Sequence, residues 1–229
     1  MYSDLTIDDF KGKDVLEVEE WARGWVLGDE WLNGLTHGFG LLFSVLGFFF
    51  LVMPALDSDE PWKLFSFSVY GLSLILLYAA STLYHTLKKP KYKKRFRTID
   101  HCAIYLLIAG SYTPFTLIPL QGSMGWLLFG IIWSLTCLGL FLKTFFIHRF
   151  QKLSTALYLL MGWMVIIAAE PLMNNFPYEG LLWLLIGGLS YTFGVLFFVT
   201  DKRKYHHAIW HLFVLGGSAC HYIAIALYI

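Results

Sequence analysis

The chain has 229 residues with a mean hydropathy of +0.60, and 57% of its residues are hydrophobic. This composition excludes a soluble domain with a mostly polar surface, and the formal net charge of +1 offers no basic surface to nucleic acid. The sequence therefore predicts an all-α integral membrane protein that crosses the bilayer several times.

Residues 1–29 are predicted to form an acidic cytoplasmic segment in front of a membrane domain that takes residues 30–229. The segment lacks the apolar core of a signal peptide, so we expect it to stay attached. Its apolar residues recur at mostly helical spacing opposite acidic ones, which indicates a helix lying in the membrane interface. These apolar residues are Val15, Leu16, Val18, Trp21, Trp25 and Val26.

Seven later segments approach the roughly 20 apolar residues that a helix needs to cross a bilayer. Proline, glycine or charged residues separate them, and the stretch around Pro90 is predicted to be a basic loop. The expected spans are residues 33–53, 63–87, 99–118, 124–146, 153–173, 180–199 and 206–228.

The distribution of positive charge predicts how these spans are oriented. Every Lys and Arg except Lys63 falls on one face, in the amino-terminal segment or in the loops after the second, fourth and sixth spans. Cytoplasmic loops carry the cationic excess in membrane proteins. We therefore expect a seven-transmembrane helix bundle with a cytoplasmic amino terminus and an external carboxy terminus, whereas six or eight spans would scatter the charges over both faces.

Ionisable residues from distant parts of the chain are predicted to meet near the cytoplasmic face. His85 closes the second span, Asp100 opens the third, and His207 and His211 open the seventh. Ser81 lies one turn before His85, so all five residues fall within about 10 Å of that surface. Ionisable groups inside a membrane are costly and usually face a protein interior or a watered cavity, which indicates a functional site.

The residue types favour a zinc site. His207 and His211 are four residues apart on one helix face, and His85 would complete a set of three imidazoles with one position open to water, as in catalytic zinc sites. Asp100 is suited to accept a proton from that water, and Ser81 to hydrogen-bond the water or a substrate carbonyl. The alternative interpretation is that these are interfacial histidines whose spacing arises by chance.

The remaining histidines are assigned other roles. His206 points about 100° away from His207 and is interpreted as an interfacial cap, and the same rotation separates His101 from Asp100. His148 lies in a basic loop, where we expect it to be solvated. His221 falls toward the external side, together with Glu170, and both are expected to pack or to hydrogen-bond.

Four runs of residues carry a resemblance to a known family. They are EWLNGLTH at 30–37, STLYH at 81–85, DHCAIY at 100–105 with YTP at 112–114, and HAIWH at 207–211. With these runs the chain resembles the haemolysin III family, the bacterial branch of the progestin and adipoQ receptor superfamily, which is also similar to alkaline ceramidases.

The resemblance implies a seven-helix fold in a bacterial inner membrane and a zinc ion held by His85, His207 and His211. It also implies that Asp100 contacts the metal through water and that Ser81 belongs to the site. Eukaryotic relatives are linked to ceramide hydrolysis or hormone response, and bacterial ones are named for haemolysis and connected with membrane homeostasis. The acidic amino-terminal segment has no counterpart in the resemblance.

Three functions are compatible with these observations. The first is a zinc-dependent hydrolase of a lipid amide or ester, with membrane lipids as partners and substrates. The second is a regulator of membrane homeostasis, or a receptor-like protein, in which the zinc is structural. The third is a pore-forming haemolysin, although the polar residues gather in one layer and not along a path through the bilayer. The oligomeric state stays open.

Overall fold

The computed structural model describes residues 29–146, 149–200 and 203–229. Within these ranges the chain is almost entirely helical and contains no strand, which confirms the all-α prediction. The predicted interfacial helix and His148 lie outside the described residues.

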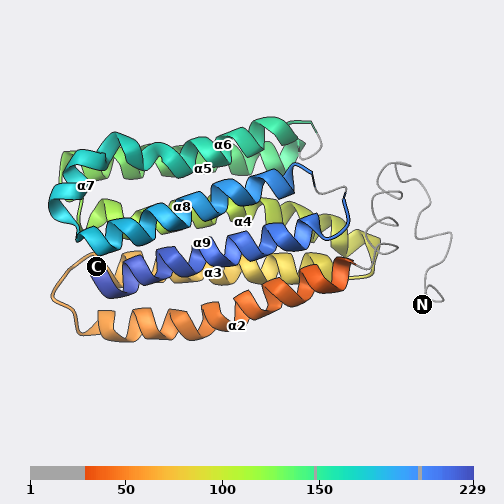
Figure 1. The fold of residues 1–229 in the computed structure, drawn as a ribbon, viewed down its shortest axis with the longest axis horizontal. Coiled ribbons are helices and arrows are strands. Elements are labelled where there is room, and N and C mark those ends of the chain that lie inside the picture. Colours follow the sequence, from red (N-terminus) through yellow and green to blue (C-terminus); the bar gives the residue numbers. More distant parts are fainter. Residues whose placement is uncertain (1–28, 147–148, 201–202) are drawn as a thin grey trace.

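The helices lie side by side as rods along the long axis of the molecule (Figure 1). α6, η2 and α7 follow one another within a single rod, and α9 contacts α2, α4 and α8. α2 begins and α9 ends at opposite ends of the bundle. The elements are α2 (Asp29–Leu56), α3 (Lys63–Thr86), α4 (Pro90–Leu117), α5 (Ser123–Phe146), α6 (Gln151–Trp163), η2 (Met164–Ala168), α7 (Ala169–Asn175), α8 (Tyr178–Phe198) and α9 (His206–Tyr228).

Six helical segments of the described residues are long and apolar enough to cross a membrane, so the chain is a multi-pass membrane protein. They are α2, α3, α5, the rod from Gln151 to Asn175, α8 and α9. α4 is not one of them, because its first turns are basic and its later turns carry Tyr, Ser and Thr. Those later turns are largely buried between α3, α5, α6 and α9, where protein and not lipid surrounds them.

The prediction of a basic loop around Pro90 is wrong. α4 begins at Pro90, nine residues before the expected start at Ile99, so Asp100 lies well inside the helix. Proline is compatible with the first helical position, where its missing N–H costs nothing, and Lys and Arg are good helix formers. The apolar segment therefore predicted only part of the helix, which extends further toward its amino-terminal end.

The rod expected at residues 153–173 is interrupted by the short 3₁₀ stretch η2. The Tyr112 hydroxyl donates to the Gly162 carbonyl oxygen at 2.9 Å and accepts from the Val165 backbone N–H at 2.8 Å. A side chain that inserts into a helix's own hydrogen-bond ladder in this way bends it. This cause lies on a different helix, α4, so the local sequence gives no sign of it.

α2 positions the site because its polar and small residues share one face. They lie toward the protein interior, while large apolar residues such as Phe43 and Phe50 are exposed on the other side. A Cβ atom at Gly40 would lie 2.5 Å from the ring of Tyr78 and 2.8 Å from Leu215, so glycine permits the close approach of α2 to its neighbours. The inward residues are Asp29, Glu30, Asn33, Gly34, His37, Gly40, Ser44 and Gly47.

Candidate metal centre

Three imidazoles converge where α3 ends and α9 begins. The ligand atoms available on His85, His207 and His211 all lie within 4.8 Å of one another. The ring centroids are 5.0 Å apart for His85 and His207, 5.1 Å for His85 and His211, and 4.7 Å for His207 and His211. His85 and His211 are buried and His207 is half-buried. Three nitrogen donors in this arrangement form a group that could hold a metal ion.

Hydrogen bonding fixes the tautomer of His85. Its Nδ1 lies 3.1 Å from the Glu30 Oε2 atom, and Glu30 is itself buried. Because the carboxylate accepts, Nδ1 carries the proton and Nε2 keeps its lone pair. That Nε2 atom is buried and has no hydrogen-bond partner among the described residues. A metal ligand histidine that donates its other nitrogen to a carboxylate has this arrangement, so the residue fits a metal ion.

The same argument applies to His211. Its Nδ1 atom lies 3.2 Å from the backbone carbonyl oxygen of Asn33 and 3.1 Å from the Thr36 hydroxyl oxygen. A carbonyl oxygen only accepts, so Nδ1 is protonated and Nε2 is left with the lone pair. α2 thus orients two of the three imidazoles, one through the side chain of Glu30 and one through its backbone.

Lys93, from the basic stretch of α4, completes the surroundings of Glu30. Its Nζ atom lies 2.7 Å from Glu30 Oε2 and 3.0 Å from the Tyr84 carbonyl oxygen. Lys93 is only 6% exposed, so this ion pair is buried. One carboxylate therefore links a buried lysine to a candidate metal ligand.

A cavity of about 120 Å³ opens beside these histidines. Ser81, Asp100, His207 and His211 line it, so four of the five residues that the sequence assigned to the site meet there from three helices, whereas His85 does not line the cavity. Ser81 is fully buried and Asp100 is 9% exposed. Most of the remaining wall is apolar, including Leu77, Ile104, Leu107, Ile108, Leu159 and Val214. The cavity therefore combines a polar end with a long apolar wall.

The other histidines differ in how they relate to this cavity. His206 bonds to the Thr200 hydroxyl through Nδ1 at 2.8 Å and does not line the cavity. His221 bonds to the Leu184 carbonyl oxygen at 3.3 Å, yet it also lines the cavity wall. His101, expected to point away from Asp100, lines the cavity as well, although its Nδ1 donates to the Arg97 carbonyl oxygen at 2.9 Å.

Three residues beside the site were missed by sequence reasoning: Glu30, His37 and Lys93. His37 stacks on His211 with ring centroids 3.5 Å apart. Glu30 and His37 are seven residues apart and share the inward face of α2 with Asn33. Polar residues that recur at this spacing in an otherwise apolar membrane helix mark its protein-facing side, and this signal was available in the sequence.

Comparisons with known proteins agree with the resemblance described above. The family model described as haemolysin-III related matches residues 26–222. The chain is 46% identical to Hemolysin-3 of Bacillus cereus over 88% of its own length and 92% of that protein. It is 45% identical to the Hemolysin-3 homolog of Bacillus subtilis, over 87% and 94%. A more distant relative is the human monocyte to macrophage differentiation factor, 32% identical over 86% and 83%.

Proposed function

Since this chain belongs to the haemolysin-III related family, we propose that it is a seven-span membrane protein that binds zinc and hydrolyses an amide or ester bond of a membrane lipid. His85, His207 and His211 hold the zinc in this proposal. The observation that carries it is the convergence of three imidazoles, two of them oriented by α2, beside a cavity that is also lined by a carboxyl group and a hydroxyl group and has apolar walls.

α4, the third helix in chain order, adds one span to the six apolar ones and brings the number to seven. With 28 residues it is about 42 Å long, which is sufficient to cross a bilayer. Its Ser and Thr hydroxyl groups bond within the helix, as Ser111 does to the Ile108 carbonyl and Thr113 to that of Ala109, so they need no water. Lipid would therefore not leave these groups unsatisfied.

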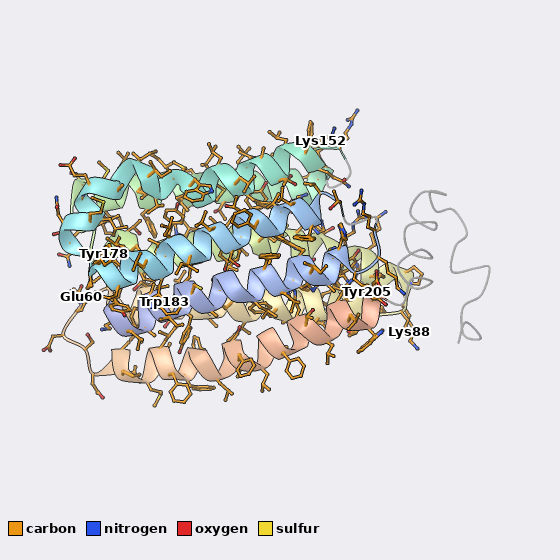
Figure 2. The ribbon with its side chains drawn as sticks, viewed as in Figure 1. Glu60, Lys88, Lys152, Tyr178, Trp183 and Tyr205 are labelled. Carbon is orange, nitrogen blue, oxygen red and sulfur yellow. The ribbon has the colours of Figure 1, made fainter. Side chains whose placement is uncertain are left out.

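Charge supports an orientation with the metal site on the cytoplasmic side of a bacterial inner membrane. Lys88 and Lys152 lie at the end of the bundle where α2 begins, and Glu60 lies at the opposite end (Figure 2). Cytoplasmic ends carry the cationic excess. The amino terminus is then inside and the carboxy terminus outside.

Asp100 and Ser81 have distinct roles in the proposed hydrolysis. A bound zinc ion would polarise the lipid carbonyl and lower the pKa of a water molecule. Asp100 accepts the proton of the water as its oxygen adds to the carbonyl carbon, and returns a proton to the amine or alcohol when the C–N or C–O bond breaks. Ser81 hydrogen-bonds the carbonyl or the water. The apolar wall holds the acyl chain.

The test is metal analysis of the purified protein combined with a panel of lipid amides and esters. We expect about one zinc per chain, lost in the double variant His207→Ala, His211→Ala because one imidazole cannot hold the ion. His206→Ala is the matched control, since this neighbouring side chain bonds to Thr200 and stays outside the cavity. Full zinc content in the double variant would refute the ligand assignment, and zinc without cleavage of any lipid would favour a structural metal and a role in membrane homeostasis.

Cytolysis is the second candidate, because the Bacillus cereus relative is named Hemolysin-3. A pore would not need the imidazoles to carry a metal. Dye release from vesicles by the purified protein, equal in the unsubstituted chain and the double histidine variant, would support a pore. Release that requires lipid cleavage and disappears with the histidines would instead make haemolysis a consequence of hydrolysis.

A further inference from the structure

His37 is a buried histidine of α2 that the proposed reaction does not use. Only 3% of the residue is exposed, and its ring lies between two others. One face stacks on His211 with centroids 3.5 Å apart and planes 10° apart, and Tyr78 approaches edge-on at 5.0 Å. Among the described residues, neither ring nitrogen has a hydrogen-bond partner, and the ring lines the cavity.

This arrangement leaves the hydrogen-bonding capacity of His37 unused. A neutral imidazole has one N–H donor and one lone pair, and burying both without partners costs free energy that a Phe or Leu side chain would avoid. The side chains on either side are already occupied: the Tyr78 hydroxyl donates to Ser218 Oγ at 2.8 Å, and His211 Nδ1 donates to the Asn33 carbonyl oxygen at 3.2 Å. The donors of both neighbours are thus engaged elsewhere, and the cavity that His37 lines gives a partner access to its ring.

That partner is not the ion held by the three histidines. An imidazole nitrogen would hold a metal only through a lone pair, which lies in the plane of its ring. Because the rings of His37 and His211 are nearly parallel and face to face, the lone pairs of His37 lie in a different plane from those of His211, and His37 would not join the residues that hold a metal. Both rings line the cavity, however, so a molecule bound there can approach His37 as well as His211.

We propose that His37 binds the polar group of the molecule in the cavity, either the acyl carbonyl or the water of the hydrolysis proposed above. The inference rests on that proposed function and adds a substrate-binding residue to it. Ser81 and Asp100 line the same cavity from α3 and α4, and His37 lines it from α2. The polar group is then held from more than one side, which fixes its orientation toward the histidine cluster.

The test uses His37→Phe, which keeps an aromatic ring on His211 and removes both nitrogens. Protein loaded with Co²⁺ in place of zinc is titrated with azide, and binding is followed in the visible spectrum. Azide accepts hydrogen bonds and donates none, so losing the His37 N–H should weaken its affinity about tenfold or more. The Co²⁺ affinity should change less than about twofold. The metal-free variant should melt no lower than the unsubstituted protein, because no hydrogen bond of that state is lost.

The control is His206→Phe, an equal change at a histidine outside the cavity, which should leave azide affinity unchanged. His37→Leu replaces the Phe variant if the larger ring prevents folding. Unchanged azide affinity in the His37 variant would overturn the inference, and so would loss of Co²⁺, because His37 would then support the metal. If the unsubstituted Co²⁺ protein bound no azide at all, the open position of the proposed function would fail first, and the inference with it.

Discussion

Replacing Glu30 with Gln tests how the site is held together, because one carboxylate oxygen serves both His85 and Lys93. Its Oε2 atom lies 3.1 Å from His85 Nδ1 and 2.7 Å from Lys93 Nζ, and the side chains of Glu30 and Lys93 are 10% and 8% exposed. The amide keeps the size of the carboxylate but carries no charge, and half of its polar atoms donate. Glu30→Gln should therefore weaken the orientation of His85 and remove a carboxylate that pairs with the Lys93 ammonium.

Two effects of different size should follow. Removing the carboxylate that orients a metal-binding histidine typically costs about 10–100-fold in metal affinity. Removing one partner of a buried ion pair costs about 3–5 kcal/mol, and the bond from Lys93 to the Tyr84 carbonyl oxygen, 3.0 Å long, places the expected loss near the lower value. The first effect appears in a zinc competition assay with a chromophoric chelator, and the second in the melting temperature of the metal-free protein.

A second variant separates the two effects. The double substitution Glu30→Gln, Lys93→Met removes both charges of the pair, so thermal stability should largely recover while zinc affinity stays low. Glu60→Gln, at the opposite end of the bundle, is the matched control and should change neither quantity. If Glu30→Gln bound zinc as tightly as the unsubstituted protein, the carboxylate would serve the fold alone and the argument about the His85 tautomer would be wrong.

Three further predictions follow from the same structure. Asp100→Asn should keep the zinc and lower lipid hydrolysis about 10²–10⁴-fold, because the amide cannot accept a proton; loss of zinc and stability together would instead indicate a structural role. A reporter fused after Ile229 should be external and one inserted after Lys89, between α3 and α4, cytoplasmic; both on the same side would exclude seven spans. Tyr112→Phe removes two hydrogen bonds at the bend near Gly162 and should destabilise the protein by about 1–3 kcal/mol in detergent unfolding.

The helices and the histidine cluster could be expected from the sequence because the signals for both are local. Apolar length identifies a spanning helix, and α9 begins and ends where the sequence predicted, at residues 206 and 228. Spacing places His207 and His211 on one helix face, and the alternation of spans brings His85 to the same end of the bundle. Neither step requires knowledge of which helices are neighbours.

Features that depend on helix neighbours could not be predicted in this way. The basic stretch after Pro90 is polar enough to be a loop in isolation, but Lys93 lies on a helix and reaches Glu30, 63 residues away in the chain. The bend between α6 and α7 likewise depends on Tyr112 of another helix. In each case the partner residue is determined by which helices pack together. The sequence of a single segment does not contain this information.

The inward face of α2 could be predicted in part from the sequence. Its polar and small residues recur every three or four positions from Glu30 to Gly47, while the opposite face is apolar. In a membrane the apolar face meets lipid, so this pattern alone assigns Glu30 and His37 to the protein interior. It does not say that Glu30 meets His85 of α3 or that His37 meets His211 of α9. Those contacts can be derived only once α2 is known to lie beside both helices. The pattern of polar and small residues shows which way a side chain points, whereas the neighbouring helices determine which residue it meets.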